Sequence, residues 1–327
     1  MRTMISLRSR AVHVAGVALM LAIPAAAVAL AAGVADAQSA QAQTALQVSL
    51  DRHWMAYGQK LAVTGNASGS NAGRRLLLEY APNRGAWTVV GSGSVGSGGR
   101  FRLVAPMRQS GSVRVIAAPG GSSSRAAVSA ELTPGSGAAI PASTPKGVVV
   151  AAKMVSGSGP LDTLAGQHVA VLGTLLPRRV GRVVRLELGT GRGWRPVAAA
   201  RTQANGHFVL RYTPSSTGAS AVRVRFGGDA FNVAARGRGR RLTAYRDSVA
   251  SWYDDGGSTA CGFHAGMGVA NVSLPCGTHV TFRYGGRTVT ATVDDRGPYV
   301  GGREWDLNQN TAGALGFNGV DTVWSSR

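Results

Sequence analysis

The amino-acid sequence predicts an all-β protein: two similar β-sandwich domains followed by a third domain of short strands. Apolar residues alternate with polar residues over five to seven positions, as at 61–65 and 100–104. Gly, Ser and Asn separate these runs, which is typical of short strands joined by turns. A set of motifs also occurs twice along the chain. Many short strands at regular spacing favour a β-sandwich in each copy.

The duplication rests on five motifs that recur in one order, at an offset of 107–109 residues. The matched pairs are 57–65 with 165–173, 73–79 with 181–187, 85–90 with 193–198, 98–104 with 205–211, and 112–115 with 221–224. A constant offset over five motifs indicates an internal repeat. We assign the first repeat to residues 44–132 and the second to 148–235. We expect Trp87 and Trp194 in the two cores, with a sugar-stacking surface as the alternative.

The N-terminal residues 1–37 have the pattern of a signal peptide. Arg2, Arg8 and Arg10 precede a long apolar run, which ends in the small residues Ala35 and Ala37. The pattern predicts cleavage after residue 37 and a secreted or cell-envelope protein. The alternative is an uncleaved anchor, since the apolar run approaches the length that spans a bilayer.

Charge is distributed unevenly along the chain. Residues 38–246 hold 27 basic and six acidic residues, whereas residues 247–327 hold five Arg and eight acidic residues. A basic region attracts anionic polymers. We therefore expect the repeats to form a basic stalk that contacts anionic wall polymers, unless arginine serves only solubility. Export argues against nucleic acid as a partner.

Two segments without apolar periodicity join the predicted domains. Residues 133–147 are rich in Pro, Ser and Gly and are predicted to be a linker. Residues 236–249 form a basic connector, either a flexible hinge or an anion-binding strip. The two cysteines, Cys261 and Cys276, are predicted to form one disulfide, worth about 3 kcal/mol on the loop-entropy argument. A two-cysteine metal site lacks further ligands at usable spacing, so we expect no metal and no cofactor.

The last 80 residues contain a hairpin, a short helix and a cluster of carboxylates. Two apolar runs flank Gly285 and Gly286, which indicates a tight hairpin turn. Asn308 is a suitable N-cap for a helix that ends before Gly316. The carboxylates are Asp294, Asp295, Glu304 and Asp306, within thirteen residues.

The motifs SWY (251–253), LPCGT (274–278), DDRGPYVGGR (294–303) and WDL (305–307) resemble the rare lipoprotein A-like family in content and order. The resemblance implies a six-stranded double-psi β-barrel over residues 250–327, a fold shared with the first domain of expansins. The two repeats resemble bacterial immunoglobulin-like modules.

The resemblance also implies a function. Enzymatic members resemble lytic transglycosylases, which cleave the glycan strands of peptidoglycan. Asp295 matches the family's catalytic aspartate, and Asp306 matches an aspartate that expansins need, so the resemblance implies Asp295 as the acid/base with Asp306 assisting. We expect peptidoglycan glycan strands as the partner, a monomer, and substrate contacts from Tyr253, His264, Asn271, Arg296 and Tyr299. Trp252 and Trp305 are expected in the barrel core.

Two departures from the family pattern keep other functions open. Phe263 stands where enzymatic members carry Glu, and Asn271 stands where they carry His. The alternatives are a non-catalytic glycan-binding or expansin-like wall-loosening module, or a protein-binding module. Structural roles are also open for the carboxylates. Asp295 suits a turn or a pair with Arg303, and Asp306 suits a helix start. Asp294 and Glu304 are expected to be solvated or charge-paired.

Overall fold

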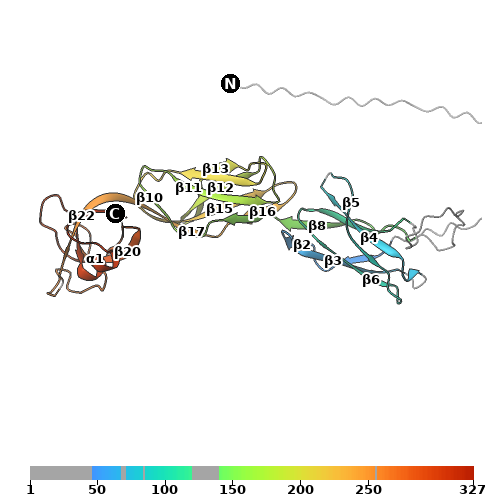
Figure 1. Cartoon of the computed structure of the whole chain (residues 1–327), viewed down its shortest axis with the longest axis horizontal. Coiled ribbons are helices and arrows are strands. Elements are labelled where there is room, and N and C mark those ends of the chain that lie inside the picture. Colours follow the sequence, from blue (N-terminus) through green and yellow to red (C-terminus); the bar gives the residue numbers. More distant parts are fainter. Residues whose placement is uncertain (1–45, 68–70, 84, 120–139, 255) are drawn as a thin grey trace, which may run out of the picture. The chain divides into compact units, whose positions relative to one another are not determined.

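The computed structural model describes residues 46–67, 71–83, 85–119, 140–254 and 256–327 (Figure 1). The regular structure of these residues is β-strand apart from one short helix. The predicted signal peptide lies outside the described residues, as do residues 133–139 of the expected linker. No helix in the described ranges is long and apolar enough to cross a membrane.

The first repeat is a sandwich of two sheets. One sheet has the order β1-β3-β6, and the other runs β2-β8-β7-β4-β5. The strands are β1 Val48–Leu50, β2 Trp54–Ala56, β3 Lys60–Asn66, β4 Arg75–Pro82, β5 Thr88–Ser94, β6 Arg100–Pro106, β7 Gly111–Ala117 and β8 Lys146–Ala151.

The second repeat has the same arrangement. Its sheets run β9-β11-β14 and β10-β17-β15-β12-β13, and β16 pairs with β15 and, at one residue, with β8. The strands are β9 Lys153–Ser156, β10 Leu161–Leu164, β11 Val169–Leu176, β12 Val183–Thr190, β13 Gly193–Arg201, β14 His207–Tyr212, β15 Gly218–Gly228, β16 Val233–Arg236 and β17 Arg240–Tyr253.

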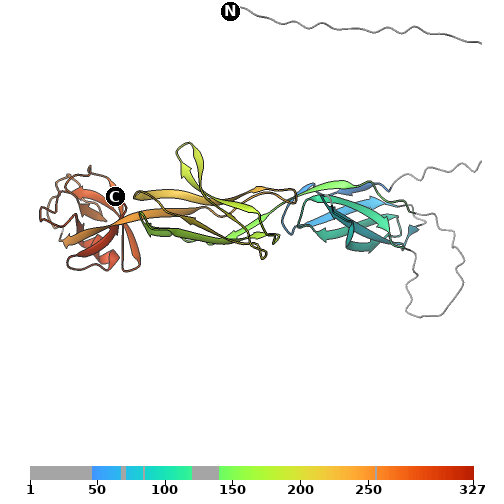
Figure 2. The same cartoon turned by 90° about the horizontal axis from the view of Figure 1, so that it is seen from above.

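In each repeat, a strand from the following segment completes the larger sheet. β8 pairs with β2 in parallel in the first repeat, and β17 pairs with β10 in parallel in the second. Val148 and Val150 of β8 accordingly lie in the first core, so residues 146–151 complete the first repeat rather than opening the second. The expected basic connector likewise becomes strand from Arg240 onward, and β17 continues to Tyr253 (Figure 2).

A glycine under a phenylalanine ring recurs in both sandwiches. A Cβ on Gly65 would lie 2.4 Å from Cζ of Phe101, and a Cβ on Gly173 would lie 2.4 Å from Cζ of Phe208. Both phenylalanines are buried in their cores. The close approach explains why glycine occupies a position inside a strand, where it is otherwise unfavourable.

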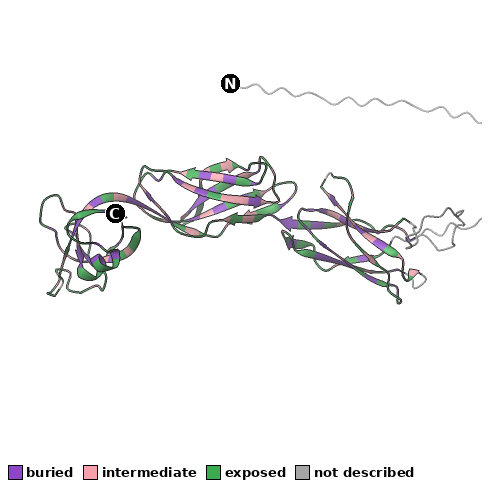
Figure 3. Ribbon diagram, in the orientation of Figure 1, coloured by how far each residue is buried: buried purple, intermediate pink, exposed green. Residues whose placement is uncertain are grey.

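Each sandwich encloses its own apolar core, and burial alternates along the strands as the pleat requires (Figure 3). The expectation that Trp87 and Trp194 lie in these cores is wrong. Trp194 is 40% exposed, and its ring lies 4.1 Å from the guanidinium carbon of Arg223. Trp87 stacks in the same way on Arg114, at 4.3 Å. Both indoles cover an arginine on the outside of the sheet.

The C-terminal domain is built from six strands and one helix. Its elements are the second half of β17, β18 Gly268–Ala270, β19 His279–Tyr284, β20 Arg287–Asp295, β21 Trp305–Asn308, α1 Gln309–Leu315 and β22 Asp321–Ser325. Each of the six strands pairs with two others, in the order β17-β22-β19-β20-β18-β21, and β21 pairs in turn with β17. This arrangement agrees with the double-psi barrel that the resemblance implied.

Local signals predicted in the C-terminal domain are confirmed. Gly285 and Gly286 form the two-residue turn between β19 and β20, both with positive φ. The side chain of Asn308 accepts a hydrogen bond from the amide of Thr311, and Gly316 ends α1 in the left-handed conformation. Cys261 and Cys276 are joined as a disulfide.

The core of this domain includes Trp305, which is fully buried and meets the ring of Phe282 edge-on. The core position expected for Trp252 is wrong, because its side chain is 40% exposed and donates to Asn318. Trp252 shares a face of β17 with the core residue Ala250, but it lies one residue before the end of the strand.

Candidate functional site

Asp295 and Asp306 lie in one cross-strand row, on either side of a small residue. Ala270 of β18 is directly opposite Asp295 of β20 and directly opposite Asp306 of β21. The row continues to Ser251 of β17, which is opposite Asp306. Two strand spacings place the backbones of the two aspartates about 10 Å apart. The side chains of a row share one face, so the fold gathers two carboxylates over Ala270.

The pKa of Asp306 is raised from its ordinary value, chiefly because burial disfavours the charged form. The negative charge of Asp295 adds to the increase. The Ser251 hydroxyl, which donates to Oδ1 at 2.8 Å, and the charge of Arg303 both oppose it. A carboxyl group with a raised pKa holds a proton more readily and suits a general acid. The helix-start role considered for Asp306 is wrong, because Asn308 is the N-cap.

Asp295 anchors the loop that precedes β18. Its Oδ1 accepts hydrogen bonds from the backbone amides of Ala260 and Arg296, both at 2.8 Å. The alternative pairing with Arg303 does not appear among the ion pairs of the described residues. Asp295 thus accepts backbone amides as a turn residue does, and it also faces Asp306 across Ala270. The two roles coexist in one side chain.

Asp294 has a different role from its neighbour. Its side chain is 1% exposed and accepts the amides of Ala265, at 2.8 Å, and Val269, at 3.1 Å. Burial raises the pKa of this carboxyl, while the backbone amides act against the increase. The expectation that Asp294 is solvated or charge-paired is therefore wrong, because it holds the 265–269 loop from inside. Glu304 does pair with a cation, Arg246, as expected.

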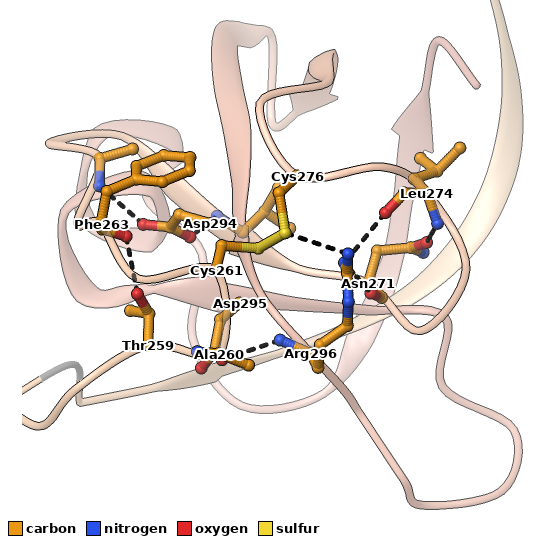
Figure 4. Close-up of a disulfide and its surroundings, with 12 residues drawn as sticks. Thr259, Ala260, Cys261, Phe263, Asn271, Leu274, Cys276, Asp294, Asp295 and Arg296 are labelled. Atoms are coloured by element: carbon orange, nitrogen blue, oxygen red, sulfur yellow. Dashed lines mark hydrogen bonds between the residues drawn. A yellow bond between two sulfur atoms is a disulfide. The ribbon is translucent and has the colours of Figure 1, made fainter.

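The disulfide and Arg296 hold the loops around the carboxylates together (Figure 4). Nη1 of Arg296 donates to the carbonyls of Asn271, at 3.1 Å, and Leu274, at 2.9 Å. Nη2 lies 3.0 Å from Sγ of Cys276. These contacts use the guanidinium to support the 271–276 loop, so the structure shows Arg296 as a structural group; its substrate contact stays a prediction.

Asn271 is also used by the fold. The side chain is 5% exposed, and its Oδ1 accepts the amides of Ser273 and Leu274. Its Nδ2 donates to the carbonyl of Glu304. Its side-chain amide therefore closes a loop. The substrate contact expected for Asn271 stays a prediction.

Exposed aromatic and apolar side chains lie on the loops next to the carboxylates. Tyr299, four residues after Asp295, is 80% exposed. Phe263 is 41% exposed, and its loop is held by Asp295 through Ala260. His264 is exposed beside Phe263, whereas Tyr253 is half-buried. Sequence reasoning missed Phe263 as a surface group, and it missed Ser251 and Ala270, whose places depend on strand register.

The described residues contain no group of three or more His, Cys, Asp or Glu side chains placed to hold a metal ion. The Asp295–Ala270–Asp306 row offers two carboxylates and a hydroxyl on neighbouring strands. Carboxyl groups in such a row can exchange protons with a polar ligand.

Residues 246–323 match a family of double-psi β-barrel domains described as lytic transglycolase. The match confirms the predicted rare lipoprotein A-like domain, which is related to expansins, at the C-terminal end of the chain. Such a domain indicates a module concerned with cell-wall glycan, in an extracellular or envelope protein. The repeats before Arg246 lie outside the match.

Other comparisons add little. The solved D0–D1 domain of intimin is similar over 61% of this chain and 98% of that structure, at 12% identity and a TM-score of 0.22. A likeness that weak carries no argument. No curated protein matches the chain.

Proposed function

We propose that this protein is exported to the cell wall and acts on peptidoglycan glycan strands through its barrel, as a lytic transglycosylase-like enzyme. The observation that carries the proposal is the row in which Asp295 and Asp306 flank Ala270 within the family-matched domain. The small side chain of Ala270 leaves the two carboxylates without a bulky group between them. Tyr299 and Phe263 offer exposed ring faces on which sugars pack.

The chemistry assigns different tasks to the two carboxylates. Asp306 has the raised pKa, so we assign the acid role to Asp306 rather than to Asp295, the acid/base that the resemblance implied. Asp306 donates a proton to the glycosidic oxygen as the bond to the anomeric carbon breaks. A hydroxyl of the same sugar then forms a bond to the anomeric carbon. The Asp306 carboxylate takes the proton of that hydroxyl and returns to its starting state. No water is consumed, and the product carries an anhydro ring. Asp295 supplies the negative charge beside the developing positive charge.

A second candidate, a non-catalytic glycan-binding or wall-loosening module, has its own supporting observation. Phe263 replaces the acid that enzymatic family members carry, and Asn271 is occupied by the backbone of its own loop. The carboxylates would then bind sugar hydroxyls as acceptors, and the aromatic rings would provide most of the contact.

Incubation of the purified protein with peptidoglycan, intact and stripped of its peptides, separates the two candidates. Mass spectrometry of the soluble fraction should show anhydro-sugar products. Asp306→Asn and Asp295→Asn should each reduce their release at least about a hundredfold, the usual size of a lost acid or base. Asp247→Asn, an exposed carboxylate on β17 of the same domain, is the matched control and should release products at the normal rate.

The outcomes are distinct. Absence of anhydro products, with the protein still sedimenting with the wall, would reject the enzyme and leave the binding module. Products that persist in both aspartate variants would reject the assignment of the site.

A further inference from the structure

The second repeat carries a row of three arginines across three neighbouring strands. Arg185 of β12 is directly opposite Arg225 of β15, and Arg225 is directly opposite Arg236 of β16. All three side chains are exposed, while their strand neighbours Val184 and Val224 are buried. The guanidinium groups therefore share the outward face of one sheet. We call these three residues the arginine row.

The arginine row lacks enough negative charge to balance it. Glu187 is the acidic side chain in contact with this part of the face, and it lies 2.7 Å from Arg223 and 3.5 Å from Arg225. Within the described residues, neither Arg185 nor Arg236 has an ion pair. Like charges directly opposite on neighbouring strands destabilise a sheet. The arrangement therefore costs the sheet stability, and an anionic ligand bound to the row would offset that cost.

The first repeat provides an internal control, because its register is the same. Leu77 of β4 is directly opposite Ile116 of β7, at the places that Arg185 and Arg225 hold in the second repeat. The next pair is unchanged between the repeats: Glu79 is opposite Arg114, as Glu187 is opposite Arg223. The same sandwich fold therefore forms with apolar residues at these two positions in the first repeat and with arginines in the second.

We propose that the arginine row is a binding surface for a linear polymer with phosphodiester groups. Arginine presents a planar fork of donors that matches phosphate oxygens, and phosphate offers acceptors to two guanidinium groups at once. Neighbouring strands of a sheet are about 5 Å apart. A polymer that lies across the strands can therefore contact all three arginines. The surface lies wholly in the second repeat and is independent of the barrel's activity.

The test compares two double variants for binding to poly(glycerol phosphate). Arg185→Leu with Arg225→Ile copies the pair already present in the first repeat, so the sheet should remain folded. Arg192→Leu with Arg211→Leu removes two exposed charges from the same repeat, in a turn and on the other sheet. Binding is measured by titration with labelled polymer over a series of salt concentrations.

The first variant should bind about tenfold more weakly, as expected for two exposed charge contacts. The slope of log affinity against log salt concentration should become less steep by about 2, that is, by about 1 for each phosphate contact removed. The control variant should bind the polymer with nearly the same affinity as the unchanged protein. Arg236→Gln, at the exposed last residue of β16, should give a smaller loss in the same direction.

Three results would overturn the proposal. The unchanged protein could fail to bind the polymer, or the control variant could lose as much affinity as the first. Equal binding of polyglutamate, with the same losses, would show that any polyanion suffices and would reject the phosphate assignment.

Discussion

The two repeats are the same sandwich with different outer faces. Both have a glycine beneath a buried phenylalanine, and both stack a tryptophan on an arginine that pairs with a glutamate. The repeats differ at the next cross-strand pair on the same face. The first repeat has Leu77 opposite Ile116, and the second has Arg185 opposite Arg225. The comparison separates two kinds of charge. A charge that is balanced within the fold contributes to stability, whereas arginines that outnumber the acidic side chains beside them suggest a ligand.

The largest expected effect comes from breaking the shared interior. In Gly173→Ala, the new Cβ would lie 2.4 Å from Cζ of Phe208 and 2.7 Å from the carbonyl oxygen of Val155. Overpacking of this kind costs about 1–3 kcal/mol. Gly65→Ala should cost the same, because its surroundings are alike. Chemical denaturation measures both, with Gly147→Ala, which has open space around it, as the control. Unequal losses would show that the interiors are not equivalent.

The glutamates should respond differently in the two repeats. The side chain of Glu187 is 4% exposed and holds two arginines, whereas that of Glu79 is 13% exposed and holds one. Glu187→Gln leaves the arginine row with no opposing charge, so it should cost about 2 kcal/mol. Glu79→Gln should cost about 1 kcal/mol. The free energies of unfolding of the two variants measure these costs. Added salt should reduce the difference between the two costs, because it screens the repulsion among the arginines. An equal cost would contradict the charge argument.

Replacing the tryptophans should have a modest effect. Trp87→Ala and Trp194→Ala each remove a stacking contact with arginine on the outer face of a sheet, worth about 0.5–1 kcal/mol. A tryptophan in a core would cost about 3–5 kcal/mol instead. Thermal unfolding of the two variants therefore checks where the indoles lie. A loss near the larger figure would place them in the cores after all.

The smallest effect concerns the barrel, where Asp306 is a charge with few partners. Its pKa is raised in the folded state, so the stability it contributes is complete below its unfolded value, near 4. That contribution is lost as the pH rises through the higher folded value. Asp306→Asn should therefore stabilise the barrel at neutral pH, by less than about 1 kcal/mol because the side chain is only partly buried. Denaturation at several pH values measures this. A variant that is less stable at neutral pH would contradict the direction of the shift.

Much of the fold followed from local signals in the sequence. The duplication, the hairpin at Gly285, the N-cap at Asn308 and the disulfide all depend on neighbouring residues, which a sequence displays directly. The ends of the repeats did not follow, because β8 and β17 complete sheets begun far earlier in the chain. Such pairings depend on long-range contacts.

The candidate site was predicted in part. The motifs located Asp295 and Asp306, but the row through Ala270 needs the register of three strands, which no local pattern contains. Asn271 and Arg296 were expected at the substrate, yet the structure shows them joined to the backbone of nearby loops. The core positions predicted for Trp87 and Trp194 were wrong. A large aromatic residue in a strand pattern is usually in the core, but each of these indoles stacks on an arginine on the outer face of a sheet.

The most direct test of the central claim moves the arginine pair without changing composition. One variant would combine Arg185→Leu and Arg225→Ile with Leu77→Arg and Ile116→Arg, so the net charge is unchanged. Arg236 is opposite Arg225 in the second repeat. The pairing of β7 with β8 covers only Gly111 to Val113, so among the described residues no strand residue is opposite Ile116 at the equivalent place, and the first repeat lacks the third member of the row. The account predicts that this variant loses affinity for poly(glycerol phosphate) about tenfold. Binding equal to that of the unchanged protein would show that total charge, not the arginine row, attracts the polymer.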